Sequence, residues 1–203
     1  MKDIQKILET IKSCSQKAAT KLIAVDGFGG SGKSTLTEKL VELYSSIKVV
    51  GLDKFPCLPT EHSYHSVGAQ TRINLERFQN EVLIPLSEGK EARFQNTFWW
   101  PTDQAPERFT VQPGEIVLIE GCYSFHKDIR HFYDLSIWVD CAPDEAMERA
   151  VARDGESGRS LWEEAHAPNE RQYVAAQQPQ KYVDLIVFNV ADKSFFIKAE
   201  HIT

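Results

Sequence analysis

The chain has 203 residues, of which 42% are hydrophobic and 26% are charged, and its formal net charge at pH 7 is −6. This composition is typical of a single globular domain and excludes disordered and collagen-like chains. The acidic balance argues against an extended surface for nucleic acid or anionic membranes, and no apolar run approaches the roughly 20 residues of a membrane span. The expected partner is therefore a small molecule.

The N-terminal segment is predicted to be an amphipathic helix. Four apolar residues recur at helical spacing among charged ones, which is not the pattern of a leader peptide: Ile4, Ile7, Leu8 and Ile11. Such a helix either docks on its own domain or forms a homodimer interface. The chain also has four cysteines, Cys14, Cys57, Cys122 and Cys141. Because they show no paired spacing, we expect reduced thiols in a cytoplasmic protein.

Five short apolar runs predict β-strands: KLIAVD, IKVVGLD, EIVLIEG, LSIWVD and DLIVFN. Helix-period segments lie between most of them, which is the pattern of a parallel sheet with crossover helices, so the expected fold class is α/β. Ligands bind beyond the carboxyl ends of the strands in such sheets. The acids at the ends of these runs are therefore site candidates: Asp26, Asp53, Glu120 and Asp140.

Two helices are predicted beside these strands. One opens near Lys33, and the other covers residues 143–154, where Pro143 and two acids stand in the first turn. The apolar stripe of the first consists of Leu36, Leu40, Leu43 and Tyr44.

Residues 55–113 differ from the rest of the chain. They hold six of the nine prolines and an amphipathic stretch from Arg72 to Glu88. We expect an excursion from the sheet that carries substrate contacts. The excursion also holds an aromatic cluster of Phe94, Phe98, Trp99 and Trp100. Such clusters more often pack in a hydrophobic core than line a ligand pocket, so we expect these residues to be core. His62 and His65 are expected at the surface.

The stretch AVDGFGGSGKSTL places four glycines within six positions, directly before a lysine and two hydroxyls. It satisfies G-x-x-x-x-G-K-[ST] between a predicted strand and a predicted helix, which is the context of a P-loop. Backbone N–H groups of such a loop surround phosphates, the lysine reaches the β- and γ-phosphates, and the serine hydroxyl binds Mg²⁺. We therefore expect ATP or GTP, with Mg²⁺, at Gly27, Gly29, Gly30, Ser31, Gly32, Lys33, Ser34 and Thr35.

Two acids are candidates for the chemistry of phosphoryl transfer. Glu120 ends a strand and is followed by Gly121, so we expect it to hold Mg²⁺ together with Ser34. Asp53 is expected to accept a proton from an acceptor hydroxyl. Asp26 directly precedes the loop, and we expect it only to brace the loop's backbone amides.

A lid is predicted at residues 153–162. Arg149 and Arg153 are four residues apart, on one face of a helix, and the turn-rich segment DGESGR follows. Arginines in such a lid stabilise charge on the transferred phosphoryl group and exclude water. Arg153 is the expected catalytic arginine and Arg149 a nucleotide-binding one, with Arg159 as a further candidate.

Six segments, in this order, resemble the uridine kinase family within the P-loop nucleoside kinase and phosphoribulokinase group: DGFGGSGKST, VVGLDKF, LERFQNEVLIPLSEGK, VQPGEIVLIEGCYS, LSIWVDCAPDEAMERAVARD and YVAAQQPQKYVDLIV. The resemblance runs from about residue 20 to residue 190. It implies a P-loop NTPase fold with a five-stranded parallel core and a lid, and ATP- or GTP-dependent phosphorylation of a primary hydroxyl on a small acceptor.

The resemblance also implies roles by position. Lys33 and Ser34 match the family's phosphate and magnesium residues, Asp53 its catalytic acid and Glu120 its magnesium-side carboxylate. The lid arginines match Arg149 and Arg153. The chain departs from the family pattern at two places that concern the acceptor. The segment LDKFPC has a proline where the family has a tyrosine-like residue, and the segment NTFWW lacks the acid that the family has there.

We therefore expect an ATP-dependent kinase of a small molecule, with a nucleoside as acceptor and uridine as the best single candidate. Pantothenate, nicotinamide riboside and sugar phosphates are alternative acceptors. A nucleotide-switched regulatory protein is a further alternative, although the chain lacks an Asn-Lys-x-Asp guanine-reading motif.

Overall fold

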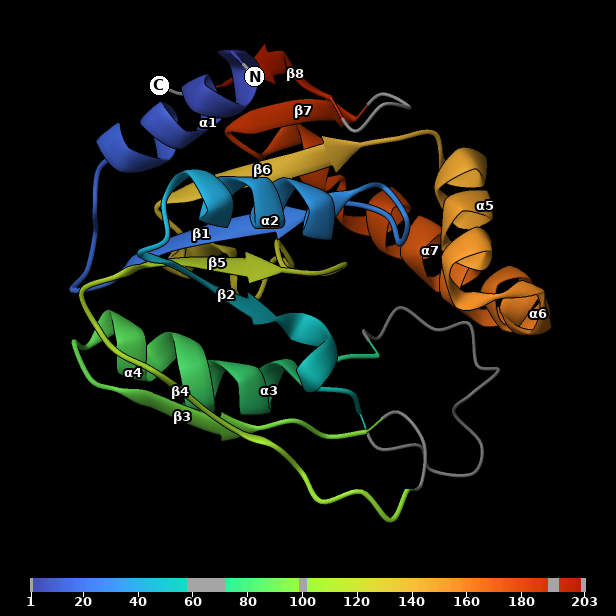
Figure 1. Cartoon of the computed structure of the whole chain (residues 1–203), viewed down its shortest axis with the longest axis horizontal. Helices are drawn as coiled ribbons and strands as arrows, with labels where there is room; N and C mark the ends of the chain where they lie inside the picture. Colours follow the sequence, from blue (N-terminus) through green and yellow to red (C-terminus); the bar gives the residue numbers. More distant parts are fainter. Residues whose placement is uncertain (1, 58–71, 99–101, 190–193, 202–203) are drawn as a thin grey trace.

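The computed structural model describes residues 2–57, 72–98, 102–189 and 194–201 (Figure 1). Its main sheet has the strand order β2-β5-β1-β6-β7-β8. The strands are β1 (Lys21–Asp26), β2 (Ile47–Gly51), β5 (Ile116–Glu120), β6 (Leu135–Asp140), β7 (Leu185–Asn189) and β8 (Phe195–Glu200). The first five pair in parallel and coincide with the five predicted strands, which confirms the α/β class.

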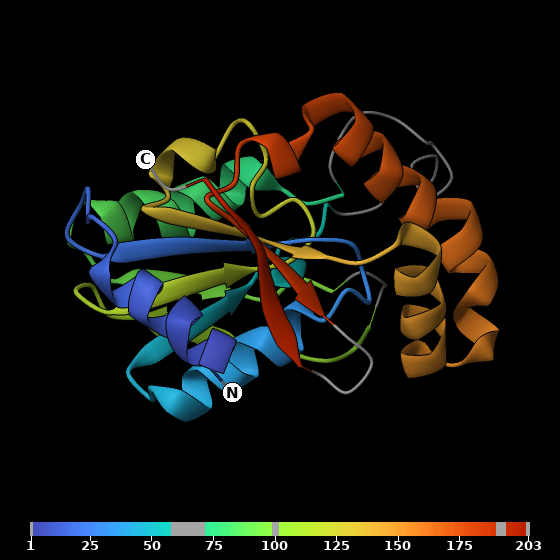
Figure 2. The same cartoon turned by 90° about the horizontal axis from the view of Figure 1, so that it is seen from above.

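Helices cover both faces of the sheet, and alternate residues of β1 enter two different cores. Ile23 and Val25 pack with residues of α1 (Lys2–Ser13) and α2 (Lys33–Leu43) on one face. Leu22 and Ala24 face the other core, with α3 (Leu75–Phe78), α4 (Ile84–Ser87) and α7 (Ala167–Gln177). Figure 2 shows α1 and α2 on one side of the sheet and α3 and α4 on the other. A strand buried on both faces explains the continuous apolar run LIAV.

The sequence analysis did not predict β8, which pairs antiparallel with β7 at the edge of the sheet. The helix α1 lies against β8 and α2 (Figure 1). Its four stripe residues are buried, so the predicted amphipathic face is covered within the chain. The ammonium group of Lys21 donates to the carbonyls of Ile11, Lys12 and Cys14, at 3.2, 2.7 and 2.9 Å. This cation therefore caps the C-terminal end of α1.

The two predicted helices beside the strands are confirmed. Leu36 and Leu40 are fully buried in α2, whereas Leu43, in its last turn, is 51% exposed. The other helix, α5, spans Pro143–Asp154 as predicted. A second helical run follows it and consists of α6 (Arg159–Leu161), a π-helical turn at Trp162–His166 and α7. Short 3-10 turns lie at Leu52–Lys54, Arg130–Phe132, Glu156–Gly158 and Pro179–Lys181.

The excursion contains the predicted helical stretch, as α3, a π-helical turn (Gln79–Leu83) and α4, and a hairpin of β3 (Ala92–Gln95) and β4 (Arg108–Val111). Phe94 is buried, with its ring 5.1 Å from that of Phe55 and 5.2 Å from that of Phe109. It is therefore core, as expected. His62, His65, Trp99 and Trp100 lie outside the described residues.

No helix in the described part of the chain is long and apolar enough to cross a bilayer.

Candidate nucleotide and acceptor site

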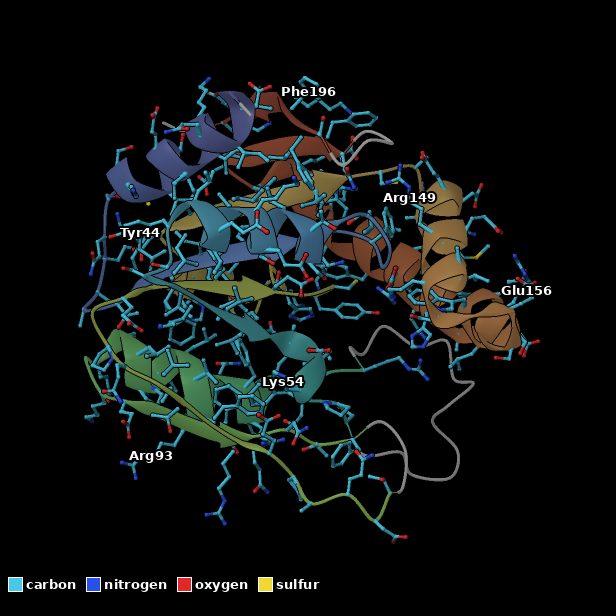
Figure 3. All side chains as sticks on the ribbon, viewed as in Figure 1. Tyr44, Lys54, Arg93, Arg149, Glu156 and Phe196 are labelled. Carbon is cyan, nitrogen blue, oxygen red and sulfur yellow. The ribbon has the colours of Figure 1, made fainter. Side chains whose placement is uncertain are left out.

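A cavity of about 690 Å³ opens at the carboxyl ends of the parallel strands. The P-loop, the ends of β2 and β5, and the helices α5 to α7 form its walls (Figure 1). The structure brings together in this cavity the predicted residues Gly29, Gly30, Gly32, Lys33, Ser34, Thr35, Asp53, Glu120, Arg149 and Arg153. Figure 3 shows Arg149 on α5, whereas Arg93 lies on the outer hairpin, away from these walls. Gly27 and Ser31, the other two predicted residues of the loop, are buried and are not among the residues that line the cavity.

The P-loop needs each of its four glycines because neighbouring atoms leave no room for a side chain. A Cβ at Gly30 would lie 2.0 Å from the carbonyl oxygen of Ala146, and one at Gly32 would lie 2.1 Å from Nδ2 of Asn189. Both glycines also have positive φ, +83° and +101°. The glycine pattern is thus a packing requirement as well as a conformational one.

The loop presents unpaired backbone donors to the cavity. Within the described residues, the N–H groups of Gly30, Gly32, Lys33 and Ser34 have no protein acceptor. They stand at the N-terminal end of α2, where helix geometry leaves N–H groups free and the dipole favours an anion. Lys33 is buried, and its ammonium group donates to the carbonyls of Gly27 and Phe28 at 3.0 and 2.8 Å. This arrangement fits the phosphate groups of a nucleotide.

Oxygen ligands suited to Mg²⁺ lie beside these donors. The Ser34 hydroxyl and the Glu120 carboxylate both line the cavity. Burial raises the pKa of Glu120, while the Lys33 ammonium opposes this shift. No group of three or more His, Cys, Asp or Glu side chains that could hold a metal is found among the described residues. One carboxylate and one hydroxyl nevertheless suit Mg²⁺, which keeps several waters and takes its other ligands from substrate phosphates.

Asp53 reaches the cavity from the 3-10 turn that follows β2. In the register of the β2–β5 pair, Gly51 lies opposite Glu120, so the two acids follow neighbouring strand ends. A Cβ at Gly51 would lie 2.4 Å from Oδ1 of Asp53. The glycine therefore leaves space for the Asp53 carboxylate, which is exposed at the cavity.

The two predicted lid arginines line the cavity. Nε and Nη2 of Arg153 bind the carboxylate of Asp154 at 2.6 and 2.9 Å. The same carboxylate accepts the indole N–H of Trp162 at 3.0 Å. Arg149 binds Glu145, one turn earlier on α5, at 2.6 Å. Residues 153–162, the predicted lid, comprise the end of α5, the 3-10 turn at Glu156–Gly158, α6 and the first residue of the π-helical turn.

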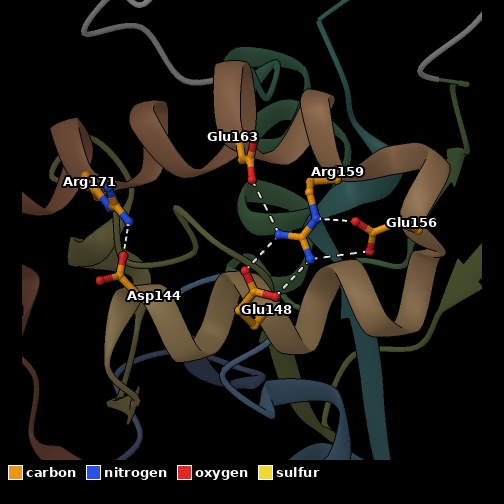
Figure 4. Close-up of polar contacts among 6 residues, drawn as sticks. All are labelled: Asp144, Glu148, Glu156, Arg159, Glu163 and Arg171. Atoms are coloured by element: carbon orange, nitrogen blue, oxygen red, sulfur yellow. Dashed lines mark hydrogen bonds and ion pairs between the residues drawn. The ribbon is translucent and has the colours of Figure 1, made fainter.

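Arg159, the third candidate, is not brought to the cavity. Its guanidinium binds Glu148 of α5 at 2.8 Å and also pairs with Glu156 and Glu163 (Figure 4). These contacts join the helix α5 to the helical run that follows it. Arg159 therefore joins these two helical segments and is not among the residues that line the cavity.

Asp26 accepts a hydrogen bond from the P-loop as expected, and it also accepts hydrogen bonds from two other segments of the chain. Its buried carboxylate accepts the N–H groups of Gly27, Tyr123 and Phe125, at 2.7, 3.2 and 3.0 Å, and the hydroxyl of Tyr173 at 2.6 Å. Burial raises the pKa of Asp26, and the hydrogen bond from Tyr173 is the largest of the contacts that oppose this shift. One side chain thus joins the P-loop, the segment after β5, and α7.

The sequence analysis did not single out three residues that line the cavity, Trp162, His166 and Glu170. Glu170 of α7 accepts the N–H of Gly29 at 2.9 Å, and Trp162 packs on the same glycine. Arg72 donates to Nδ1 of His166 at 3.2 Å. Burial, reinforced by Arg72, lowers the pKa of His166 to about 4. No motif marks these residues, because they come together only when the helical run that carries Trp162, His166 and Glu170 packs beside the P-loop.

The parallel sheet and the glycine-lined cradle define a P-loop nucleotide-binding protein. The family model described as "Phosphoribulokinase / Uridine kinase family" matches residues 22–195. The chain belongs to this family, and it is accordingly a P-loop kinase that transfers phosphate to a small molecule.

Similar proteins agree with this assignment. A uridine-cytidine kinase 2-B of Danio rerio is 25% identical over 197 aligned residues, which cover 84% of this chain and 74% of that protein. A uridine kinase of Brevibacillus brevis is 27% identical over 149 residues, 69% of each chain. A solved structure titled as a possible uridine kinase of Bacillus stearothermophilus covers 90% of this chain and 96% of its own, with a TM-score of 0.67 and 18% identity. At 18% identity, the similarity to this structure supports a shared fold only.

Proposed function

We propose that this protein is an ATP-dependent nucleoside kinase, similar to uridine kinases, that transfers the γ-phosphate to a 5′-hydroxyl. One observation carries the proposal: Lys33, Asp53, Glu120 and Arg153 line a single cavity. The names of the relatives that are 24–27% identical to this chain support a nucleoside acceptor. We also propose a cytoplasmic location, which the reduced thiols of Cys14, Cys122 and Cys141 support.

The roles follow from chemistry and position. Asp53 takes the proton of the acceptor hydroxyl as the hydroxyl oxygen attacks the γ-phosphorus and the bond to the ADP oxygen breaks. Lys33 stabilises negative charge on the β- and γ-phosphates from below, and Arg153 does so from the lid. Arg149 is placed to bind the nucleotide beside it.

Ser34 and Glu120 are the residues that would hold Mg²⁺, with the remaining positions filled by phosphate oxygens and water. The metal ion, when bound, neutralises charge on the phosphates during transfer. ATP is the proposed phosphate donor, and GTP is the alternative. Titration of the protein with each nucleotide distinguishes the two donors.

A coupled ADP-release assay with MgATP tests the proposal. The acceptors are uridine and other nucleosides, pantothenate, nicotinamide riboside and sugar phosphates, each compared with a blank without acceptor. Turnover above the blank with a nucleoside supports the proposal. Turnover only with another acceptor keeps the kinase and rejects the nucleoside, whereas no acceptor-dependent turnover despite nucleotide binding would favour a nucleotide-switched protein.

A pair of variants tests for a phosphorylated acceptor. Arg72 lines the cavity, whereas Arg93 is on the hairpin and pairs with Glu91. A guanidinium at the cavity suits a substrate phosphate. If the acceptor carries a phosphate, Arg72→Ala lowers turnover of that acceptor alone, and Arg93→Ala does not.

A further inference from the structure

Asn189 is the last residue of β7, and its side chain lies against the P-loop, although the proposed transfer gives it no role. The side chain is buried, and its Nδ2 donates to the carbonyl oxygen of Ser31 at 3.0 Å, across 158 positions of the sequence. A Cβ at Gly32 would lie 2.1 Å from the same nitrogen. The end of β7 therefore contacts the peptide unit that joins Ser31 to Gly32.

An amide at the end of β7 is not explained by packing in the core. Leu185 and Val187, on the same face of the strand, are apolar and fully buried. Asn189 is also buried, but its Oδ1 has no hydrogen-bond partner among the described residues. A buried acceptor without a partner lowers the stability of the fold. The strand thus has an unsatisfied amide where it reaches the P-loop, which indicates a role for the donor group of that amide.

The geometry of the peptide unit relates this donor to phosphate binding. In a planar trans peptide the C=O and N–H bonds point in opposite directions, and the described residues contain no cis peptide bond. Because Asn189 binds the Ser31 carbonyl, the N–H of Gly32 points away from β7. Gly32 lines the cavity, and its N–H is one of the donors without a protein acceptor in the described part of the chain.

The backbone on either side of this peptide unit is held by other hydrogen bonds. The Ser31 N–H donates to the carbonyl of Phe28, and the Gly32 carbonyl accepts the N–H of Leu36, both at 3.0 Å. The unit between them precedes a glycine with a φ of +101°, and glycine offers little steric resistance to rotation of its backbone. The hydrogen bond from Asn189 therefore opposes a rotation that would turn the Gly32 N–H away from a ligand.

We propose that Asn189 is a positioning residue, which holds the Ser31–Gly32 peptide unit so that the Gly32 N–H donates to a bound phosphate. The inference rests on the nucleotide binding proposed above. Asn189 is not among the residues that line the cavity, so it acts through Gly32 and not by contact with the nucleotide.

The test compares Asn189→Ala with the wild-type protein in the presence of Mg²⁺. Isothermal titration calorimetry measures the affinity for ADP and AMPPNP, and ¹H–¹⁵N spectra follow the amides of the P-loop. We expect both nucleotides to bind about tenfold more weakly, because each loses one hydrogen bond to a charged group. The shift that ADP causes at the Gly32 amide should shrink, whereas the shift at the Ser34 amide, in the first turn of α2, should remain.

Asn169→Ala is the matched control. Asn169 is 7% exposed and Asn189 is 8% exposed, and Nδ2 of Asn169 also donates to a carbonyl oxygen, that of Ala165, at 2.8 Å. This contact lies within one helical run, so the control should leave both dissociation constants within about twofold of wild type.

Three results would overturn the inference. These are unchanged affinities for Asn189→Ala, an equal loss of affinity in Asn169→Ala, and a loss of affinity with an unchanged response of the Gly32 amide to ADP. If Asn189→Ala does not fold, Asn189→Asp takes its place, because aspartate keeps the shape of the side chain and lacks the donor. The same reduced response is then expected at Gly32.

The two proposals fail in different ways. A wild-type protein that binds neither AMPPNP nor ADP contradicts the proposed function itself. A wild-type protein that binds both, together with an Asn189 variant that binds them equally well, contradicts only the role of Asn189.

Discussion

Trp162 packs its ring directly against the P-loop residue Gly29. A Cβ at Gly29 would lie 2.4 Å from Cη2 of the indole ring and 3.0 Å from Oε1 of Glu170. The helical run that carries both side chains therefore reaches the P-loop only because residue 29 has no side chain. This contact also fixes the indole that binds Asp154, the partner of Arg153.

Gly29→Ala should separate the lid from the P-loop. An added methyl group meets a ring and a backbone-bound carboxylate, and such overpacking costs about 1–3 kcal/mol. We expect KM for ATP to rise roughly tenfold while the protein stays folded by circular dichroism. The control is Gly158→Ala, since a Cβ at Gly158 would meet no atom within 4 Å. Equal KM values for the two variants would contradict the role of the Gly29 contact.

Asp53→Asn should remove the proton acceptor without disturbing the phosphate cradle. We expect kcat to fall by about 10²–10⁴-fold, the usual contribution of a general base. The affinity for ATP, measured by calorimetry, should stay within about threefold of wild type. Lost ATP binding with residual transfer would contradict the assignment of Asp53.

Arg153→Gln and Arg159→Gln form a pair that tests which lid arginine serves catalysis. Arg153 lines the cavity, whereas Arg159 binds three glutamates. Loss of one charged donor to a developing oxyanion costs about 10²–10³-fold in kcat. We expect that loss for Arg153→Gln and a change below about threefold for Arg159→Gln in steady-state assays. The reverse order would move the catalytic role to Arg159.

His166 should make the protein less stable in mild acid. Burial and Arg72 lower the pKa of His166 to about 4, while an unfolded histidine titrates near 6.5. Between these values the unfolded chain binds more protons, so the free energy of unfolding falls as the pH falls, by up to about 3 kcal/mol.

The measurement is urea denaturation at pH 7 and pH 5 for the wild type and His166→Asn, whose amide oxygen still accepts from Arg72. The raised pKa values of Asp26, Glu120 and Glu170 act in the opposite direction in both proteins and cancel in the comparison. An equal dependence on pH in the two proteins would exclude His166 as the titrating group.

Local patterns were sufficient to predict most of the elements. The five parallel strands are continuous apolar runs, and α5 begins with a proline and two acids, so each carries its signal within a dozen residues. The P-loop is likewise a local motif. The strand β8 was missed because its identity depends on pairing with β7, and FFIKAE alternates too weakly to mark a strand alone.

The part of the site formed by α7 could not be predicted. Glu170 and Tyr173 belong to a helix with little amphipathic character, and both are buried against segments more than 100 residues earlier in the chain. Nothing near them in sequence distinguishes Glu170 from an exposed glutamate such as Glu163. Their roles arise from the path of the chain over the sheet, which residue spacing does not encode.

The four donors that meet on Asp26 have a consequence for local opening of the native state. Gly27 and Tyr123 are 96 positions apart in the printed sequence, yet their amide hydrogens end on one carboxylate with that of Phe125. Amides protected by one acceptor should open together. Hydrogen exchange at these three amides is therefore expected to give a single opening free energy. The P-loop and the segment after β5 would then open cooperatively, in one local unfolding event.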